Sequence, residues 1–340
     1  MPQKTDAIII GAGPCGLFAI FQLGINGLKA QVIDALDRPG GQCTELYPAK
    51  PIYDIPGFPQ IDGQDLTDRL IKQAEPFEPV YHLGQVATEL SRTESGNWQV
   101  STSLGTVLEA PVVIVASGGG SFTPKRPPSV DNLEHYEGSG VQYAVREPAN
   151  FSGRRVVIAG GGDSAVDWAL ALEPITAELT LLHQREELRA QPHSAENLAA
   201  LVAQGRIVRK TGRVTRLEGN APSLDSIVIG GRGGEEVIAA DHLLVFFGLT
   251  MKPGPIESFG FDLLDGLIPV DTERFETSLP GVFAVGDINY YPGKLKLILS
   301  GFHEAALMAK AAVRICRPDE AVRLEYTTSS TRIQKLLRVA

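Results

Sequence analysis

Short apolar runs that end in glycine, each followed by a longer helix-like stretch, organise this 340-residue chain. The first run covers Asp6–Ile10 and leads into the turn Gly11–Gly16 and a helix-like stretch that reaches about Gly27. A second apolar run follows at Ala30–Asp34. Apolar runs of about four to eight residues bounded by turn residues are typical of buried strands. The pattern therefore predicts a strand–helix–strand unit at the start of the chain.

The same unit recurs halfway along the chain. Arg155–Ala159 predicts a strand, a glycine turn follows, a helix reaches about Leu172, and Leu179–His183 predicts the next strand. In both copies, 23 positions separate the first glycine of the turn from the last residue of the second strand. Two units with equal spacing indicate two separate nucleotide-binding domains.

Three further apolar runs place the borders between these domains. Ala110–Ala116, Asp241–Phe247 and Gly281–Val285 read as buried strands that end near glycine, and a helix-like segment covers about 300–315. We expect an α/β fold of two Rossmann-like, three-layer ββα dinucleotide-binding domains, the second inserted into the first. The expected bounds are 1–118 and 249–324 for the first domain, 119–248 for the second and 325–340 for a C-terminal extension. This tail, rich in Thr and Ser, is expected to be disordered by default.

Composition limits the function classes. Charged residues make up 21 % and hydrophobic residues 43 % of the chain, as in ordinary soluble proteins. The net charge of −9 argues against a dedicated nucleic-acid binder, and the apolar runs are too short to span a membrane. Three cysteines form neither a disulfide framework nor a zinc pattern, which favours the reducing cytoplasm and no bound metal.

The first glycine turn has the spacing of a dinucleotide-binding loop. Gly11 and Gly13 let the backbone approach a pyrophosphate, and Gly16 lets the helix pack on the strand. Cys15 lies in the same turn. Asp34 can accept hydrogen bonds from both ribose hydroxyls of an unphosphorylated adenosine, which favours FAD or NAD; the alternative is a solvated residue at a strand end.

The second turn differs at the position that corresponds to Asp34. His183 stands there, and Arg185 and Arg189 follow it. Two guanidinium groups and no carboxylate suit a 2′-phosphate, so NADP is favoured over NAD. The alternative is a pair of surface arginines neutralised by the intervening glutamates. The residues expected to bind this dinucleotide are Gly160, Gly162, Asp163, Ser164, Ala165, His183, Arg185 and Arg189.

Three motifs resemble those of the thioredoxin-reductase flavoproteins, namely Gly160–Ala165, His183–Arg189 and Val282–Asp287. The resemblance implies FAD at the first turn and NADPH or NADP⁺ at the second. It also implies that Asp287 binds the ribityl chain of FAD and that the segment Lys296–Ser300 is the N-terminus of a helix that points at the flavin pyrimidine.

The cysteines depart from the pattern of that group. Thioredoxin reductases carry Cys-x-x-Cys where this chain has Tyr143 and Arg146, so dithiol chemistry cannot occur there. Cys43 stands where glutathione-reductase-like enzymes hold a redox disulfide, but their second cysteine falls at Pro48. A single reactive thiol at Cys43, in an NADPH-dependent oxidase or disulfide reductase, stays an alternative to a passive buried thiol.

The chain is most similar in pattern to the ferredoxin–NADP⁺ reductases of the thioredoxin-reductase type. The matching segments are Gly40–Pro48, Tyr53–Pro59, Gly293–Ile298, Gly301–Glu304 and Glu325–Ser330. The resemblance implies hydride exchange with NADP(H), single-electron exchange with ferredoxin or flavodoxin, and a homodimer. A non-catalytic flavin-binding redox sensor is the other alternative.

This resemblance also implies further FAD contacts. Tyr47 would stack on one face of the isoalloxazine and Tyr326 would cover the other, although both can be ordinary core and tail aromatics. The further residues expected at the FAD site are Gln42, Val86, Phe122, Ile298 and Thr328. Ferredoxins are usually acidic, and the basic residues that can attract one are Lys125, Arg126, Arg206, Arg209, Lys210, Arg213, Arg332, Lys335 and Arg338, any of which can instead be solvated surface.

Overall fold

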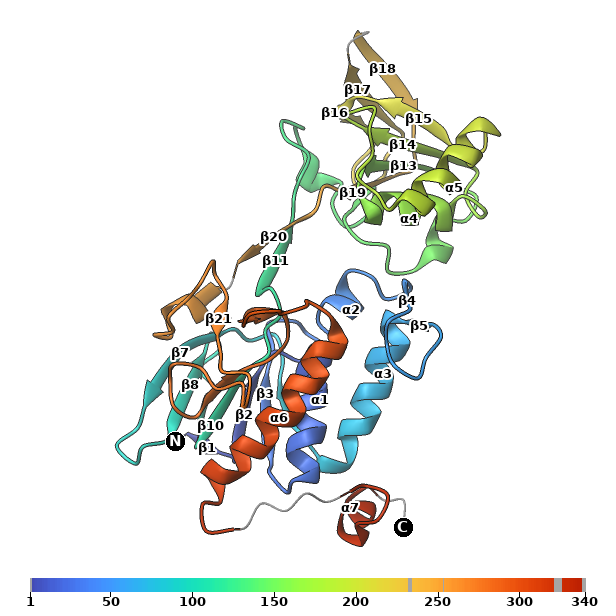
Figure 1. Cartoon of the computed structure of the whole chain (residues 1–340). Helices are drawn as coiled ribbons and strands as arrows, with labels where there is room; N and C mark the ends of the chain where they lie inside the picture. Colours follow the sequence, from blue (N-terminus) through green and yellow to red (C-terminus); the bar gives the residue numbers. More distant parts are fainter. Residues whose placement is uncertain (1, 232–233, 253, 321–325, 338–340) are drawn as a thin grey trace. The chain divides into compact units, whose positions relative to one another are not determined.

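The chain forms two compact units in the computed structural model, which describes residues 2–231, 234–252, 254–320 and 326–337. Unit 1 consists of Met1–Phe122 and Met251–Ala340, and unit 2 consists of Thr123–Thr250 (Figure 1). The chain crosses between them through β11 (Ser121–Pro124) and β20 (Leu249–Lys252), which pair in a two-stranded sheet. These bounds differ by a few residues from those expected at 118 and 248, and the C-terminal extension is grouped with unit 1.

The core of unit 1 is a five-stranded parallel sheet in the order β22-β10-β2-β3-β6. Its strands are β2 (Ala7–Ile10), β3 (Ala30–Ile33), β6 (Val80–His82), β10 (Val112–Val115) and β22 (Val282–Ala284). All residues of β2 and β10 are buried. Strands buried on both faces read as continuous apolar runs, which is why the sequence shows them without alternation.

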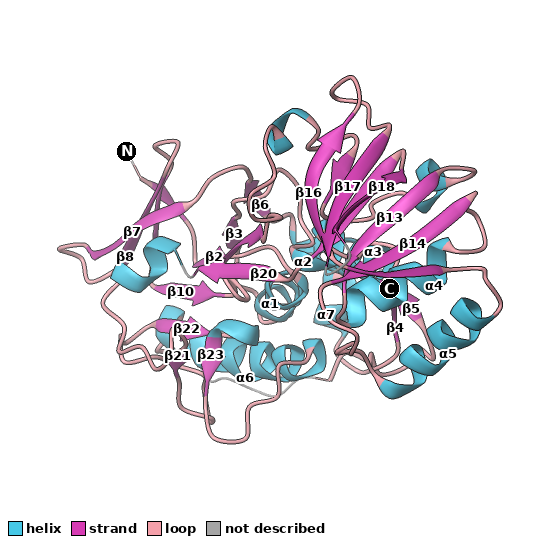
Figure 2. Cartoon of the chain, turned by 90° about the horizontal axis from the view of Figure 1, so that it is seen from above, coloured by secondary structure: helices cyan, strands magenta, loops and turns pink. Residues whose placement is uncertain are grey.

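Helices cover one face of this sheet and a second sheet covers the other. The helices are α1 (Pro14–Ile25), α3 (Gly63–Ala74) and α6 (Ile298–Cys316), with α1 beside α6 (Figure 2). The second sheet has the order β1-β9-β8-β7, with β1 (Gln3–Lys4), β7 (Ala87–Arg92), β8 (Trp98–Thr102) and β9 (Val107–Ala110). Each interface has its own cluster of buried side chains, which gives the three-layer order ββα. The smaller elements of unit 1 are α2 (Gln42–Glu45), β4 (Pro51–Ile52), β5 (Ile61–Asp62), β21 (Ile268–Pro269), β23 (Asn289–Tyr290) and α7 (Thr331–Leu336).

Unit 2 repeats this architecture. A parallel sheet in the order β12-β19-β13-β14-β15 packs against a three-stranded antiparallel sheet, β16-β17-β18. The parallel strands are β12 (Val141–Gln142), β13 (Arg155–Gly160), β14 (Glu178–His183), β15 (Val208–Thr211) and β19 (His242–Phe246), and the antiparallel strands are β16 (Arg213–Glu218), β17 (Ser226–Gly231) and β18 (Gly234–Ala239). Its helices are α4 (Asp163–Leu172) and α5 (Pro192–Ala203). The expected fold of two Rossmann-like domains is confirmed.

Two segments differ from the expectation. Ala110 belongs to β9, and Pro111 separates it from β10, because proline has no N–H to donate to a sheet. The tail is not disordered throughout, since Thr331–Leu336 forms α7. Its first turn is capped by Ser330, and Ile333 is 2 % exposed. No helix among the described residues combines the length and apolarity needed to cross a membrane.

Candidate functional site

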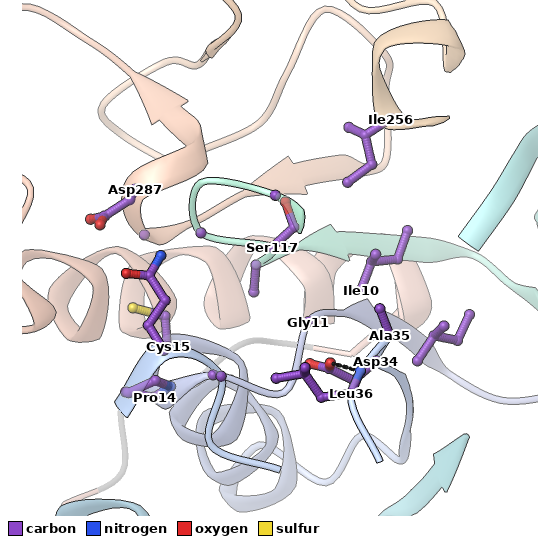
Figure 3. Close-up of a pocket in the computed structure, with 18 of the residues that line it drawn as sticks. Ile10, Gly11, Pro14, Cys15, Asp34, Ala35, Leu36, Ser117, Ile256 and Asp287 are labelled. Atoms are coloured by element: carbon purple, nitrogen blue, oxygen red, sulfur yellow. Dashed lines mark hydrogen bonds between the residues drawn. The ribbon is translucent and has the colours of Figure 1, made fainter. Parts of the chain in front are cut away.

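A cavity of about 520 Å³ opens in unit 1 at the carboxyl ends of three neighbouring strands (Figure 3). Gly11 follows β2, Asp34 follows β3, and Ser117 follows β10, and all three residues line the cavity. Ligands of open parallel sheets bind at this edge, and the volume is in the range of small-molecule and cofactor sites.

The glycine turn brings bare backbone and a helix N-terminus to this cavity. A Cβ added at Gly11 would lie 2.4 Å from the carbonyl oxygen of Ala116, and one added at Gly16 would lie 1.9 Å from that of Gly11. A Cβ at Gly13 would meet nothing within 4 Å. The first two positions exclude side chains so that strand and helix can approach, whereas Gly13 leaves space for a ligand. No side chain caps the N-terminus of α1, so its N–H groups are available for an anion.

Asp34 is held rigidly beside this turn. One carboxylate oxygen accepts a hydrogen bond from the N–H of Ala12 (2.5 Å) and the other accepts one from the N–H of Leu36 (2.8 Å). Burial raises the pKa of the Asp34 carboxyl, and the two backbone N–H groups oppose that shift. Each oxygen keeps a further lone pair, so the fixed carboxylate can receive a diol.

Polar groups also stand at the other side of the cavity. Figure 3 shows Asp287 apart from Asp34, beyond Cys15 and Ser117. Burial raises the pKa of the Asp287 carboxyl, and the positive charges of Lys294 and Lys296 oppose that shift. The Ser117 hydroxyl is buried without a hydrogen-bond partner among the described residues, which suits a site completed by a ligand.

Helix α2 adds the thiol of Cys43 to the cavity lining, and Tyr47, two residues beyond the helix, adds an aromatic ring. The thiol of Cys43 donates to the hydroxyl of Tyr47 over 3.7 Å. Burial raises the pKa of the Tyr47 phenol above its ordinary value and raises that of Cys43 to about 11. Both groups are therefore neutral near pH 7.

The structure brings most of the residues expected at the FAD site into this one cavity, while Gly16 lies behind its wall. The expected residues that line it are Gly11, Gly13, Cys15, Asp34, Gln42, Tyr47, Val86, Asp287 and Ile298. The side chain of Phe122 lies outside the described residues. The lining also includes Gln85 and Ile256, which the sequence did not single out because their loops carry no motif of their own. It includes Lys296 as well, which lies in the matching segment Gly293–Ile298.

The described part of the tail lies elsewhere in its own chain. Tyr326 is 66 % exposed, and neither it nor Thr328 is among the described residues that line the cavity. The guanidinium of Arg332 donates to the carbonyl of Ile25, at the C-terminal end of α1, whereas the cavity lies at the N-terminal end. Flavin contacts of Tyr326 and Thr328 stay a prediction.

The glycine turn of unit 2 is tied to the segment that follows β14. The N–H of Arg189 donates to the carbonyl of Gly161 (2.6 Å), and the carboxylate of Asp163 accepts from the N–H of Gln191 (2.7 Å). At the same edge, Gly162 immediately precedes α4 and Ser164 is the second residue of that helix. Gly160 has no room for a side chain, since a Cβ there would lie 2.8 Å from that of buried Ala165.

A group of positive charges surrounds the end of β14. A Cβ at Gly161 would lie 2.5 Å from the His183 ring, which therefore sits directly beside the turn. Burial lowers the pKa of His183, and the charges of Arg185, Arg209 and Arg189 lower it further. Among the described residues, no ion pair joins Arg185 or Arg189 to the glutamates at 186 and 187.

Arg209, which the sequence suggested only as a candidate for ferredoxin docking, is a further candidate for the second turn because its charge acts on His183. It pairs in register with Leu181, so it shares the sheet face of His183, two residues farther along β14. Lys210 points to the opposite face and forms an ion pair with Glu236 (2.6 Å). Arg209 and Lys210 are adjacent in the chain but lie on opposite faces of the sheet. The sequence alone does not reveal which face each residue occupies.

The pyridine nucleotide-disulphide oxidoreductase family matches residues 5–311 of the chain. The chain belongs to this family. Its curated relatives include ferredoxin–NADP reductases from Parvibaculum lavamentivorans and Bradyrhizobium sp., each 53 % identical over 99 % of this chain and 98 % of the relative. The expected resemblance to that group is confirmed.

Solved structures support the fold of this pyridine nucleotide-disulphide oxidoreductase. Thioredoxin reductase from Lactococcus lactis superposes with a TM-score of 0.72 at 24 % identity, covering 92 % of this chain and 99 % of that one. Thioredoxin reductase from T. acidophilum gives 0.73 at 23 % identity, covering 91 % and 98 %. At the position where the resemblance to thioredoxin reductases implies a cysteine, the hydroxyl of Tyr143 donates to the carboxylate of Glu137 (2.6 Å).

We predict that Cys43 reacts slowly with iodoacetamide in the protein reduced by NADPH under anaerobic conditions. A pKa of about 11 leaves roughly one thiol in a thousand ionised at pH 8, against about a quarter for a free cysteine, so alkylation should be at least about 100-fold slower than that of glutathione. The rate should rise with pH, because the thiolate accumulates only as the pH approaches that raised pKa.

Peptide mass spectrometry distinguishes Cys43 from Cys15 and Cys316. Labelling of Cys43 at the rate of free glutathione would show an activated thiol and would revive the disulfide-reductase alternative.

Proposed function

We propose that this oxidoreductase is an FAD-dependent ferredoxin–NADP⁺ reductase. It exchanges a hydride with NADP(H) and single electrons with ferredoxin or flavodoxin. The observation that carries the proposal is the contrast between its two glycine turns. One stands beside a fixed carboxylate and a large cavity, the other stands among three arginines, and the chain contains no Cys-x-x-Cys pair.

The residues that line the cavity of unit 1 suit the successive parts of the FAD molecule. Asp34 would bind the adenosine ribose, the turn Gly11–Gly16 and the N-terminus of α1 would bind the pyrophosphate, and Asp287 would bind the ribityl chain. Tyr47 would pack on the isoalloxazine ring, which FAD uses to accept hydride from NADPH and to release electrons one at a time.

The turn of unit 2 fits NADPH. The N-terminus of α4 would bind its pyrophosphate, and Arg185, Arg189 and Arg209 would surround the 2′-phosphate beside His183. The neutral imidazole that results from the lowered pKa of His183 can donate or accept a hydrogen bond there without adding charge.

The alternatives have weaker support. A disulfide reductase would need a reactive thiol, but Cys43 is buried and its pKa is raised to about 11. A redox sensor without catalysis has no use for the arginine group beside the second turn. Among the expected ferredoxin-docking residues, Arg126, Arg206 and Lys210 each form an ion pair with a glutamate, so their charges are partly neutralised.

The deciding experiment compares electron acceptors. With NADPH under anaerobic conditions, we expect rapid bleaching of the flavin, and cytochrome c reduction that depends on added ferredoxin or flavodoxin. Omission of the electron carrier is the control. Oxidation of NADPH by a low-molecular-weight disulfide, as fast as with ferredoxin, would contradict the proposal.

We predict that the arginines set the preference for NADPH. Arg185→Ala, Arg189→Ala and Arg209→Ala should each lower the ratio of kcat/KM for NADPH over NADH by roughly tenfold, since each removes a charge-assisted bond to the 2′-phosphate. The rate with NADH should change little. Steady-state kinetics with both cofactors measure the ratio.

Lys210→Ala is the matched control, because this neighbour of Arg209 lies on the opposite sheet face. An unchanged ratio in the Arg209 variant would remove that residue from the site. A wild-type ratio near one would contradict the NADP assignment itself.

We further propose a cytoplasmic homodimer whose tail covers the flavin of the second copy. Its three cysteines are free thiols, as a reducing compartment requires. Because the described tail lies at the far end of α1 in its own chain, capping by Tyr326 needs a second copy or a displaced tail. Sedimentation should give the mass of two chains, and deletion of 325–340 should alter single-turnover hydride transfer. A monomer with unchanged rates after the deletion would refute this arrangement.

A further inference from the structure

A buried ion pair stands directly behind the cavity of unit 1. Glu304 on α6 is fully buried, and the side chain of Lys294, with which it pairs, is 5 % exposed. Charges removed from water in this way destabilise a protein unless they are paired and hydrogen-bonded. Neither residue lines the cavity, so the pair is not explained by direct contact with a ligand.

The Glu304 carboxylate accepts hydrogen bonds from the segment that joins β22 to α6. One oxygen accepts from the N–H of Gly286 (2.7 Å) and from the side-chain amide of Asn289 (2.8 Å). The other accepts from the hydroxyl of Tyr291 (3.0 Å) and from the ammonium of Lys294. Four donors occupy this one carboxylate, and all four come from residues 286–294.

The bonds converge on the residues that face the cavity. Gly286 has a φ of +79°, and the residue after it is the cavity-lining Asp287. Glu304 lies on the same helix as Ile298, the first residue of α6, which also lines the cavity. One carboxylate therefore fixes the turn that carries Asp287 to the helix whose N-terminus reaches the same cavity.

The two charges act on Asp287 with opposite signs. Lys294 lowers the pKa of the Asp287 carboxyl, whereas Glu304 raises it. As an intact pair they oppose each other at that position, with Lys294 exerting the larger effect. Loss of either partner would leave a single uncompensated charge beside the cavity, with little water to screen it.

We propose that Lys294 and Glu304 are positioning residues for the cofactor, holding Asp287 and the N-terminus of α6 against FAD. The inference rests on the proposed assignment of FAD to this cavity. The pair governs the affinity for FAD and the potential of the bound flavin, in addition to any part it has in the stability of the fold.

The test uses Lys294→Met, Glu304→Gln and the double variant, with three measurements. These are the Kd of the apoprotein for FAD by fluorescence titration, the potential of the bound flavin by dye equilibration, and the Tm of the apoprotein. Each single variant should raise the Kd by roughly tenfold or more, as expected for the loss of a charge-assisted bond.

The potentials should move in opposite directions. Lys294→Met leaves a bare carboxylate and should make the potential more negative, because added negative charge disfavours reduction. Glu304→Gln leaves a bare ammonium and should make it more positive. The double variant restores neutrality and should return the potential toward wild type. A purely structural pair would not produce shifts of opposite sign.

Arg155→Met is the matched control, since Arg155 forms a partly buried ion pair with Asp241 (2.6 Å) in unit 2. It should lower the Tm without changing the Kd for FAD or the potential. Wild-type apoprotein that takes up no FAD would overturn the proposed function. FAD uptake by the wild type with unchanged Kd and potential in the single variants would overturn the positioning role alone. If the single variants do not fold, a folded double variant with wild-type Kd would overturn it as well.

Discussion

The structure depends on the close contact between strand and helix at Gly11 and Gly16. Neither position has room for a Cβ, because the backbone of β10 and of the turn itself occupies that space. Any side chain at Gly16 would push the start of α1 away from the sheet. The uncapped N-terminus of the helix would then no longer lie at the edge where β2, β3 and β10 end, and the cavity would lose its anion-binding wall.

The two units combine the same backbone arrangement with side chains of different charge. Both place a glycine turn and a helix N-terminus at the end of a parallel strand. Under the proposed function, the residue at the end of the next strand, Asp34 or His183, discriminates between the two cofactors. In unit 1 that residue is a carboxylate held by two backbone N–H groups. In unit 2 it is an imidazole among guanidinium groups. The charge at one position therefore separates the two sites, while the backbone stays the same.

The parts of the molecule governed by local spacing could be predicted from the sequence. Buried strands, glycine turns and the positions of Asp34 and His183 follow from periodicity along the chain. Contacts set by register or by distant packing could not be predicted. Arg209 reaches the second turn only because β15 pairs with β14 in one register. The bonds of Glu304 join α6 to a loop whose sequence shows no pairing pattern, and α7 depends on burial of Ile333 against another part of the chain.

Cys15 shows a consequence of packing that concerns oxidative damage. Its sulfur occupies the space between α1 and α6, since a Cβ added at Gly301 would lie only 2.2 Å from it and one added at Gly286 only 3.1 Å. Oxygen atoms added to this sulfur on the side of Gly301 would have no volume to occupy and would push the helices apart. The same burial raises the pKa of Cys15 to about 12, so the thiolate that oxidants attack is scarce. The tight packing that places the Cys15 sulfur between the two helices thus also protects it from oxidation.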